Sequence, residues 1–462
     1  MKIVVCVKQV NGELNPFDAC ALETALRIEN ADITVISMGR PQVADMLKSL
    51  TRLGIARAIL LTDNAFAGAD TLATSYTLSL AIKKISPDLV ICGRQSVDGD
   101  TAQVGPSLSQ MLGFSLITNV MKINRIDNRD NKIYCLSRMG EESVKLPALI
   151  TVERINTLRF PSIRAKTKEV EIWTAEDIGA DKDRCGLTGS PTRVLKIYES
   201  SLGKRKCTFI EPRELLSVIN KSRHKDRHGI KLKQSDKKFD EIWIVGEELK
   251  EIGLTIADKV KVIDRQPAAR IAELAKRYNP KVILWSADLW GRRNAPIAAA
   301  ILQAGLCADC THLETDGEKL YMYRPAYGGS LMAKIECRTY PQMATVRTVM
   351  ESMDEIIVAG GKGVKDCFDL IRDFANKIGA GIGATRGLVD MGIAPYEMQI
   401  GLTGKSINPK VYIACGISGV VHHTCAIEQA GTIIAINIDK GARIFEYADY
   451  GIIADVRECL VL

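Results

Sequence analysis

The sequence predicts an α/β protein with two duplicated parallel-sheet domains of nucleotide-binding type and a doubly wound α/β domain at its C-terminal end. Three observations support this fold class. Apolar strand-like runs alternate with amphipathic segments in the first 160 residues, a repeat links two parts of the chain, and further strand–helix units follow residue 351. At ~100–200 residues per domain, a chain of 462 residues is expected to hold two to four domains.

The first domain is expected over residues 1–200. Its strand-like runs are IVVCV, ITVISMG, AILLTD and LVICGR, and helical periodicity lies between them in Asp18–Ile28, VADMLKSLTRLG and LATSYTLSLAIKKI. Short β-branched runs separated by amphipathic segments are typical of a parallel sheet covered by helices. The Gly- and Pro-containing stretch GLTGSPTRV then predicts an extended tail.

A basic segment follows, expected to be a linker over residues 201–238. Twelve Lys/Arg and four Asp/Glu lie between Lys204 and Lys238, a local charge of +8 against +7 for the whole chain. A nucleic-acid surface would need interleaved aromatic residues, and only Phe209 is present. We therefore expect a solvated linker and no nucleic-acid partner.

The repeat relates the first domain to the segment after this linker. Residues 86–120 share with 279–313 a Pro, an apolar strand, a charged turn, a Gly-Pro or Ala-Pro and an apolar helix, and LPALITV (146–152) matches YPQMATV (340–346). The offset stays near 193, which generic βα units would not maintain across separate segments. A shortened second copy is therefore predicted at 239–350.

The third domain, residues 351–462, carries the clearest candidate site. Its strands are expected in EIIVAGGKGV, KVYIACG and TIIAINI, with a helix in VVHHTCAIEQ. Ligands sit at the carboxyl ends of parallel strands, where Gly-rich turns and helix N-termini offer N–H groups to phosphate. Ser418 and Gly419 would supply such donors and Lys362 a cation, although each turn alone could be a packing corner.

Other polar residues flank the same strand ends. Arg386 puts a cation between small residues in GIGATRGLVD, where a plain surface Arg is the alternative. Thr403 precedes the VYIAC strand, and His422 and His423 follow it. These side chains could all face one bound nucleotide cofactor.

Cysteine usage and hydropathy indicate the cellular compartment that we expect for this protein. Thirteen Cys lie mostly in apolar contexts, as expected for reduced thiols in a cytoplasmic protein. The pair Cys307 and Cys310 is a weak metal or redox signal, and an ordinary buried turn is the other interpretation. No apolar run approaches the ~18 residues of a membrane span, and IVVCV is too short for a signal-peptide core.

Several stretches carry a family resemblance. The second half contains RPAYGGSLMAKIECRTYPQMATVR, AGGKGV, GIGATRGLVD, GLTGKSINPKVYIACGISGVVHH and IAINIDKGARIFEYADYGIIAD, and these resemble the alpha subunit of electron transfer flavoproteins. In residues 1–198, NPFDACALE, GRQSVDGDTAQVGPSL, RFPSIRAKTKEVEIW and GLTGSPTRV resemble the beta subunit of the same family. The resemblance implies a natural fusion, with the beta part first.

The resemblance implies FAD in the third domain. Arg386 would pack over the flavin ring, Thr403 would hydrogen-bond near its reactive nitrogen, and His423 would lie by the pyrimidine carbonyl. A cation and donors aimed at that end stabilise the reduced, anionic flavin. Residues at positions of family FAD contacts are Lys362, Thr385, Arg386, Ile400, Gly401, Leu402, Thr403, Ser418, Gly419, Val420, Val421, His422, His423, Asn437, Asp455 and Val456.

Two of these positions depart from the family. Leu402 stands where Gln is frequent and removes an amide donor, and Lys362 stands where Arg is frequent and loses bidentate geometry. The redox potential of the flavin therefore does not follow from the resemblance.

A second nucleotide site is implied in the beta-like part, holding either AMP, as in ordinary members, or a second FAD, as in electron-bifurcating members. DGDTAQVGP favours FAD, whereas the short NGEL loop and the trimmed second domain argue against a place for NADH. Backbone donors of this stretch, with Thr101 at a helix start, would suit phosphate. Matching positions are Cys6, Asn15, Pro16, Phe17, Asp18, Met38 and the run 97–109, including Asp98, Gly99, Asp100, Thr101, Gln103, Val104 and Gly105.

The resemblance also implies partners. An electron carrier would serve an acyl-CoA dehydrogenase-like flavoenzyme that docks on residues 159–168, with Ile163 as anchor, and would pass electrons to a downstream acceptor by swivelling about 348–354 and the basic linker. The other hypotheses are an electron-bifurcating NADH oxidoreductase with two FAD and an adenine-nucleotide-binding module without redox chemistry.

Overall fold

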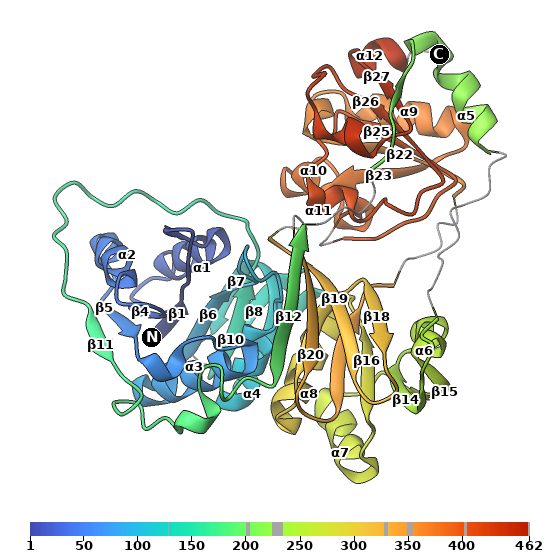
Figure 1. Cartoon of the computed structure of the whole chain (residues 1–462). Coiled ribbons are helices and arrows are strands. Elements are labelled where there is room, and N and C mark those ends of the chain that lie inside the picture. Colours follow the sequence, from blue (N-terminus) through green and yellow to red (C-terminus); the bar gives the residue numbers. More distant parts are fainter. Residues whose placement is uncertain are drawn as a thin grey trace. The chain divides into compact units, whose positions relative to one another are not determined.

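The computed structural model describes residues 1–127, 129–199, 204–223, 234–327, 331–348, 354–401 and 404–460. These residues form two compact units (Figure 1). Unit 1 comprises Met1–Tyr198, Gln234–Tyr327 and Met332–Arg347, and unit 2 comprises Glu199–Lys233, Gly328–Leu331 and Thr348–Leu462. In the part of the chain that is described, no helix has both the length and the apolar character that a bilayer crossing requires.

The first domain of unit 1 is built on a nine-stranded sheet. In spatial order its strands are β11 (Glu171–Trp173), β5 (Arg57–Leu61), β4 (Asp32–Met38), β1 (Lys2–Cys6), β6 (Leu89–Gly93), β10 (Ala148–Val152), β7 (Ser115–Asp127), β8 (Lys132–Ser137) and β9 (Gly140–Lys145). The seven strands from β11 to β7 are parallel, and β8 and β9 extend the sheet antiparallel. A two-stranded ribbon, β2 (Gln9–Val10) and β3 (Glu13–Leu14), follows β1.

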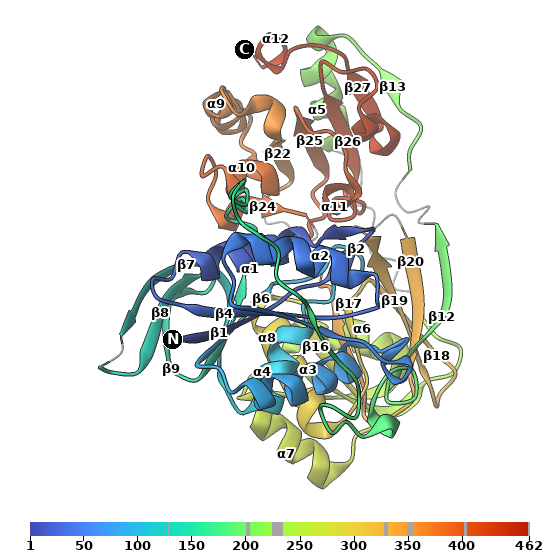
Figure 2. The same ribbon diagram turned by 90° about the vertical axis from the view of Figure 1, so that its left-hand side faces the viewer.

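Helices cover both faces of this sheet, as predicted. Helices α1 (Pro16–Leu26) and α2 (Val43–Leu50) pack on one face, and α3 (Thr71–Ile85) and α4 (Val104–Leu112) on the other (Figure 2). Each start and stop has a local cause. The Asp70 carboxylate caps α3 by accepting from the N–H groups of Leu72 and Ala73, and Gly113, at φ +73°, ends α4.

The second domain of unit 1 confirms the duplicated parallel-sheet fold. Its strands lie in the order β15 (Ala257–Ile263), β14 (Phe239–Val245), β16 (Val282–Ser286), β21 (Gln342–Val346) and β17 (Leu306–Cys310), all parallel. This is the order β4-β1-β6-β10-β7 of the first sheet. Helices α6 (Lys250–Ile256), α7 (Ala268–Tyr278) and α8 (Leu289–Leu302) connect the strands.

The two domains share a local irregularity as well. Asn119 in β7 and Asp309 in β17 both have φ +58°, and each backbone N–H donates to a Thr hydroxyl of the neighbouring strand, Thr151 at 3.0 Å and Thr345 at 2.8 Å. The strand register shifts at both places, as at a β-bulge. The repeat therefore extends to backbone detail.

Contacts within unit 1 join the two domains through α4 and α8. The Ser107 hydroxyl donates to the Pro296 carbonyl at 3.2 Å, and the Gln103 amide donates to the Leu306 carbonyl at 3.1 Å. The stretch predicted as an extended tail, GLTGSPTRV (186–194), enters β12 (Thr192–Glu199) only with its last three residues. Strand β12 joins β20 (Leu331–Cys337), β19 (Leu320–Ala326) and β18 (His312–Thr315) in a four-stranded sheet.

Unit 2 contains a seven-stranded parallel sheet. Its order is β13 (Thr208–Phe209), β27 (Tyr450–Ile452), β26 (Thr432–Ile436), β25 (Val411–Cys415), β22 (Ile356–Gly360), β23 (Gly381–Thr385) and β24 (Gln399–Ile400). Its helices are α5 (Leu215–Arg223), α9 (Phe368–Ile378), α10 (Arg386–Asp390), α11 (Val421–Thr424) and α12 (Val456–Cys459). The helix expected over VVHHTCAIEQ is thus a single turn.

The basic segment differs from the linker that the sequence predicts. Its β13 pairs with β27, and Leu215 and Ile219 of α5 are buried in the core of unit 2 (Figure 1). Arg205 anchors it by donating to Asp449 at 2.5 Å and to the Ala430 carbonyl at 2.6 Å. The sequence gives little sign of this role. Leu215 and Ile219 are a single apolar pair at i,i+4 spacing among many cations, and β13 has only two residues.

Candidate functional site

The carboxyl edge of the unit 2 sheet collects the residues predicted to bind the cofactor. Each lies at or just after the end of a parallel strand: Lys362 after β22, Thr385 at the end of β23 and Arg386 after it, Ile400 at the end of β24 and Gly401 after it, Ser418–His423 after β25, Asn437 after β26, and Asp455 and Val456 after β27. Leu402 and Thr403 lie outside the described residues. Parallel strands bring these ends to one side, where open α/β sheets bind their ligands.

A change of direction in the strand order lies between β22 and β25. The chain runs from β22 outward to β23 and β24, then returns to the other side of β22 with β25. At this point the two glycine turns pack backbone to backbone. The Gly361 N–H donates to the Cys415 carbonyl at 2.9 Å, and a Cβ on Gly363 would lie 3.0 Å from Gly416 Cα. Only glycine permits this approach.

A second constraint holds the turn after β25. Gly419 has φ +83°, and a Cβ there would lie 2.1 Å from the Ile444 backbone nitrogen. The Ser418 carbonyl accepts from that same Ile444 N–H at 3.2 Å. These contacts with Ile444 therefore fix the backbone of the turn, while Ser418 itself is exposed to solvent.

Two cations lie side by side at this edge. The aliphatic stem of Lys362 covers Gly387, since a Cβ on that glycine would meet Lys362 Cε at 2.6 Å. Gly387 is the second residue of α10, directly after Arg386. The Arg386 Nε donates to Asp390 at 3.1 Å, one turn along the helix. Lys362 and Arg386 therefore place two cations at this edge, with Arg386 paired to Asp390.

His423 is held in a buried hydrogen-bond chain. Its Nδ1 lies 3.0 Å from the Ile400 carbonyl, and its Nε2 lies 2.7 Å from the Tyr412 hydroxyl. A carbonyl only accepts, so Nδ1 carries the proton and Nε2 accepts from Tyr412. Burial lowers the pKa of His423 to about 4, so the ring is neutral at physiological pH.

This chain bears on the expected role of His423. Both ring nitrogens already have protein partners, so the ring as placed fastens the end of β24 to α11 and β25. Its neighbour His422 is exposed. Asn437 is likewise engaged, donating to the Ile417 carbonyl at 2.9 Å, and Asp455 caps α12 by accepting from the Arg457 N–H at 2.8 Å.

The beta-like site also lies at strand ends, after β1, β4 and β6. Asn15, almost fully buried, donates to the Gln95 carbonyl at 2.9 Å and accepts from the Val97 N–H at 3.3 Å. Asp18 accepts from the Lys8 N–H at 2.8 Å, and burial raises the pKa of its carboxyl to about 7. Asn15 therefore holds the loop between β6 and α4, and Asp18 holds the segment that follows β1.

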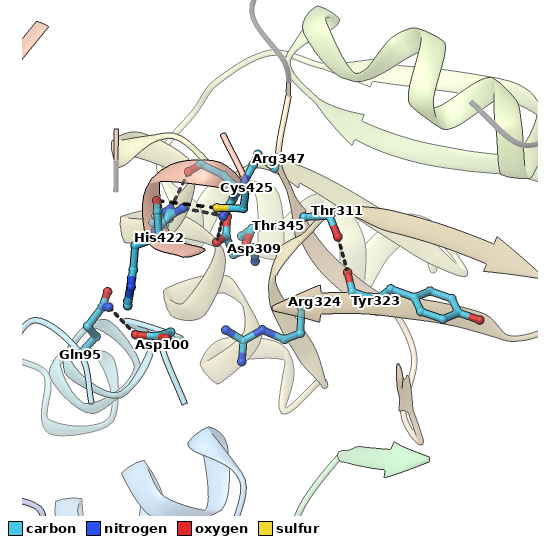
Figure 3. A network of polar contacts seen from close by, with 12 residues as sticks. Gln95, Asp100, Asp309, Thr311, Tyr323, Arg324, Thr345, Arg347, His422 and Cys425 are labelled. Atoms are coloured by element: carbon cyan, nitrogen blue, oxygen red, sulfur yellow. Dashed lines mark hydrogen bonds and ion pairs between the residues drawn. The ribbon is translucent and has the colours of Figure 1, made fainter. Parts of the chain in front are cut away.

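That loop is tied down along its length. Lys8 pairs with Asp98 at 2.6 Å, and Gln95 donates to Asp100 at 2.7 Å (Figure 3). The Gln103 amide oxygen accepts from the Thr71 hydroxyl at 2.6 Å. Helix α4 starts at Val104, so Thr101 lies in the loop, three residues before the helix start where it was expected.

The remaining predicted residues divide by exposure. Pro16 and Phe17 open α1, with Phe17 buried beneath the Arg94 guanidinium at 5.3 Å. Gly105 is closed in, because a Cβ there would meet Thr151 Cγ2 at 2.4 Å. Partly exposed positions, which remain open to a ligand, are Met38, Asp98, Gly99, Thr101 and Val104, and Cys6 is 9% exposed.

Comparison with known proteins identifies the family of this chain. The electron transfer flavoprotein domain matches residues 3–178 and 260–365, more than half of the chain, and the electron transfer flavoprotein FAD-binding domain matches residues 352–428. The chain belongs to the electron transfer flavoprotein family.

Relatives of this flavoprotein match one or the other half. It is 44% identical over 260 residues to the electron transfer flavoprotein subunit beta of Clostridium acetobutylicum, covering 50% of this chain and all of that protein. It is 40% identical over 235 residues to the subunit alpha of Thermoanaerobacterium thermosaccharolyticum, covering 41% of this chain and 71% of the relative. A subunit named CarD of a caffeyl-CoA reductase-Etf complex from Acetobacterium woodii is 39% identical over 230 residues, covering 43% and 87%.

These matches confirm the predicted fusion of a beta-like part with an alpha-like part. The segment that the FAD-binding domain matches includes both glycine turns of unit 2, together with Lys362 and Arg386. The residues fit FAD by their chemistry. The glycine turns lie at strand ends, where backbone N–H groups suit phosphate, and Lys362 and Arg386 offer positive charge to phosphate or to a reduced flavin.

Sequence reasoning missed two residues of these regions. Tyr412 reads as an ordinary member of an apolar strand, and its hydroxyl contact with His423 has no sequence signal. Arg324 lies in β19, and its Nη1 donates to the Gly99 carbonyl of the beta-like loop.

The Cys307/Cys310 pair lies in the buried strand β17, and no group of residues suited to hold a metal occurs among the described residues.

Proposed function

We propose that this flavoprotein is an electron carrier that takes electrons from a flavin-dependent dehydrogenase, of acyl-CoA dehydrogenase type, and passes them to a downstream acceptor. One observation carries the proposal: the predicted FAD contacts that are described all lie at or just after the carboxyl ends of the unit 2 strands, on both sides of the switch between β22 and β25. FAD bound there would supply the capacity to accept and release electrons singly or in pairs.

The chain's own residues would bind and tune that group. Lys362 and Arg386 would offset negative charge on the phosphates or on the reduced ring. The hydrogen-bond chain from Tyr412 through His423 to the Ile400 carbonyl would fix the start of the loop that continues to Thr403. The predicted contact of Thr403 with the ring remains part of this proposal.

The docking loop at 159–168 supports a protein partner. Phe160 and Ile163 are each 95% exposed, whereas the loop around them is held in place. Arg159 makes two hydrogen bonds of 3.0 Å to Glu23 and, with burial opposing, lowers the pKa of that carboxyl to about 2. Arg52 donates to the Ala165 carbonyl at 3.2 Å. A fastened loop with exposed apolar side chains suits insertion into a partner.

The test is direct reduction of the FAD-loaded chain. A purified acyl-CoA dehydrogenase with its substrate should bleach the flavin absorbance of the chain, and Ile163→Ser should slow this transfer while leaving FAD content and chemical reduction by dithionite unchanged. Lys166→Ser, in the same loop, serves as the control. A chain that binds FAD but accepts no electrons from any reductant would contradict the carrier function.

We further propose that the beta-like site of unit 1 binds a second nucleotide, AMP or FAD. The buried contacts of Asn15 and Gln103 fix the β6–α4 loop and leave Gly99 and Thr101 partly exposed. Denaturing the full chain and counting the released nucleotides decides among the outcomes. Two FAD per chain would favour the bifurcating alternative, one FAD with one AMP the simple carrier, and one FAD alone would remove the second site.

A further inference from the structure

Arg324 of β19 is a buried cation with unused hydrogen-bond donors. The residue is 5% exposed, and its Nη1 donates to the Gly99 carbonyl at 2.6 Å. Its Nε and Nη2 are buried and have no hydrogen-bond partner among the described residues. A guanidinium stays charged in proteins, and leaving a buried donor without a hydrogen-bond partner is unfavourable.

The nearby carboxylate of Asp309 does not satisfy these donors, because it serves two other arginines. Arg292 Nη2 lies 2.8 Å from Asp309 Oδ1, and Arg347 donates to both carboxylate oxygens. Burial raises the pKa of Asp309, but Arg292, Arg347 and Arg324 together lower it to about 2. Three arginines therefore lie around the one carboxylate of Asp309 in unit 1.

Arg324 lies against the loop of the beta-like site. Gly99 precedes Asp100 and Ala102, both in the left-handed region at φ +50° and +55°, and the loop leads into the nine-residue helix α4. Figure 3 shows the Arg324 side chain reaching from β19 toward Asp100. Turned backbone, a helix start and a cation are together suited to hold a phosphate group.

We propose that Arg324, supplied by the alpha-like part, binds a phosphate group of the nucleotide held by the beta-like loop, using its Nε and Nη2. This inference rests on the proposed second nucleotide site, and it adds a residue from the other repeat to that site. The fused chain thus completes its first nucleotide site with a side chain from the second domain of unit 1.

The test compares ligands with and without phosphate; AMP and adenosine differ in that group alone, whereas riboflavin also lacks the adenosine of FAD. Isothermal titration of the full chain, with FAD already in unit 2, uses AMP against adenosine, or FAD against riboflavin if the released nucleotides include two FAD. Arg324→Met should weaken binding of AMP or FAD about 10- to 100-fold, the equivalent of about 1.5–3 kcal/mol for a hydrogen bond to a charged group, and change adenosine or riboflavin binding less than about twofold. Arg324→Lys should fall between.

The control is Arg57→Met, the same substitution at the first residue of β5, where Arg57 pairs with Glu171 at 2.7 Å. It should leave both affinities unchanged. Equal affinity of Arg324→Met and the wild type for the phosphate-bearing ligand overturns the inference, as does an equal loss for both ligands, which would mean a purely structural role. If Arg324→Met does not fold, as judged by FAD content and circular dichroism, Arg324→Lys must show the selective loss. A wild-type chain that binds neither member of either pair refutes the second site itself.

Discussion

His423 should resist protonation to an unusually low pH, and unit 2 should lose stability on acidification for that reason. Burial lowers the pKa of His423 from 6.5 to about 4, while its hydrogen bond to the Ile400 carbonyl opposes the shift. At pH 7 both folded and unfolded chains are neutral at this residue. As the pH falls through 6.5 the unfolded chain takes up a proton that the folded chain refuses, so the free energy of unfolding decreases.

The structure gives the size of this effect. A shift of about 2.5 units corresponds to about 3 kcal/mol in full, present only below the folded pKa of about 4, and to about 2 kcal/mol near pH 5. The replacement His423→Asn keeps an N–H donor but cannot titrate. Thermal unfolding of unit 2, followed by calorimetry of the full chain, should therefore show a pH dependence between 7 and 5 that is weaker by about 2 kcal/mol in the variant.

Nuclear magnetic resonance measures the titration directly. The chain has five His, so ring-labelled histidine gives few signals, and His423→Asn assigns the one that disappears. We expect that signal to stay neutral above pH 5 and to carry its proton on Nδ1, as the Ile400 carbonyl requires. A ring that titrates near 6.5, or that carries the proton on Nε2, would refute the buried chain through Tyr412.

Three further predictions concern the core, the cofactor turn and the buried ion cluster. Leu215→Ala should destabilise unit 2 by about 2–5 kcal/mol in calorimetry because it opens a cavity, whereas Lys221→Ala on the exposed side of the same helix should change stability by less than about 0.5 kcal/mol; equal effects would mean that α5 is only a linker. Gly419→Ala should weaken FAD binding in fluorescence titrations by at least about tenfold, since the left-handed backbone alone costs about 1–2 kcal/mol and the Cβ also clashes, and Gly392→Ala, at φ +73° with open space around it, should bind FAD normally. Asp309→Asn should lower the stability of unit 1 by about 3–5 kcal/mol in urea unfolding, because the surrounding arginines lose their carboxylate; an unchanged midpoint would show that the cluster does not need the charge.

The sequence predicts the continuous strands well and the short ones poorly. The fully buried strands β22, β25 and β26 are apolar runs of five residues, and each was expected. Strand β23 reads GIGAT, and β24 and β13 have two residues each, so neither hydropathy nor β-branching marks them. Strand β13 also depends on a partner that lies over 200 residues further along the chain.

The site shows a similar division. Strand ends in a parallel sheet predict where ligand-binding residues gather, and this placed Lys362, Arg386 and Ser418 at one edge from spacing and resemblance alone. Hydrogen-bond partners do not follow from spacing. The partner of His423 is a hydroxyl on a buried strand, and that contact depends on the packing of side chains in three dimensions.

The duplication explains why Arg324 carries no signal in the sequence. Matching bulges at Asn119 and Asp309 show that the two repeats keep the same backbone, whose left-handed position favours Asn or Asp. Their charges differ: in the first repeat the buried acid is Glu153, after β10, whereas in the second the acid sits at the bulge and Arg347 takes the place after β21. An alignment of the repeats therefore pairs the strands correctly but places the acid Glu153 opposite the base Arg347. The buried cations can be located only from the folded chain, and Arg324, which keeps two donors without a partner among the described residues, lies beside the loop where the first repeat would need a phosphate ligand.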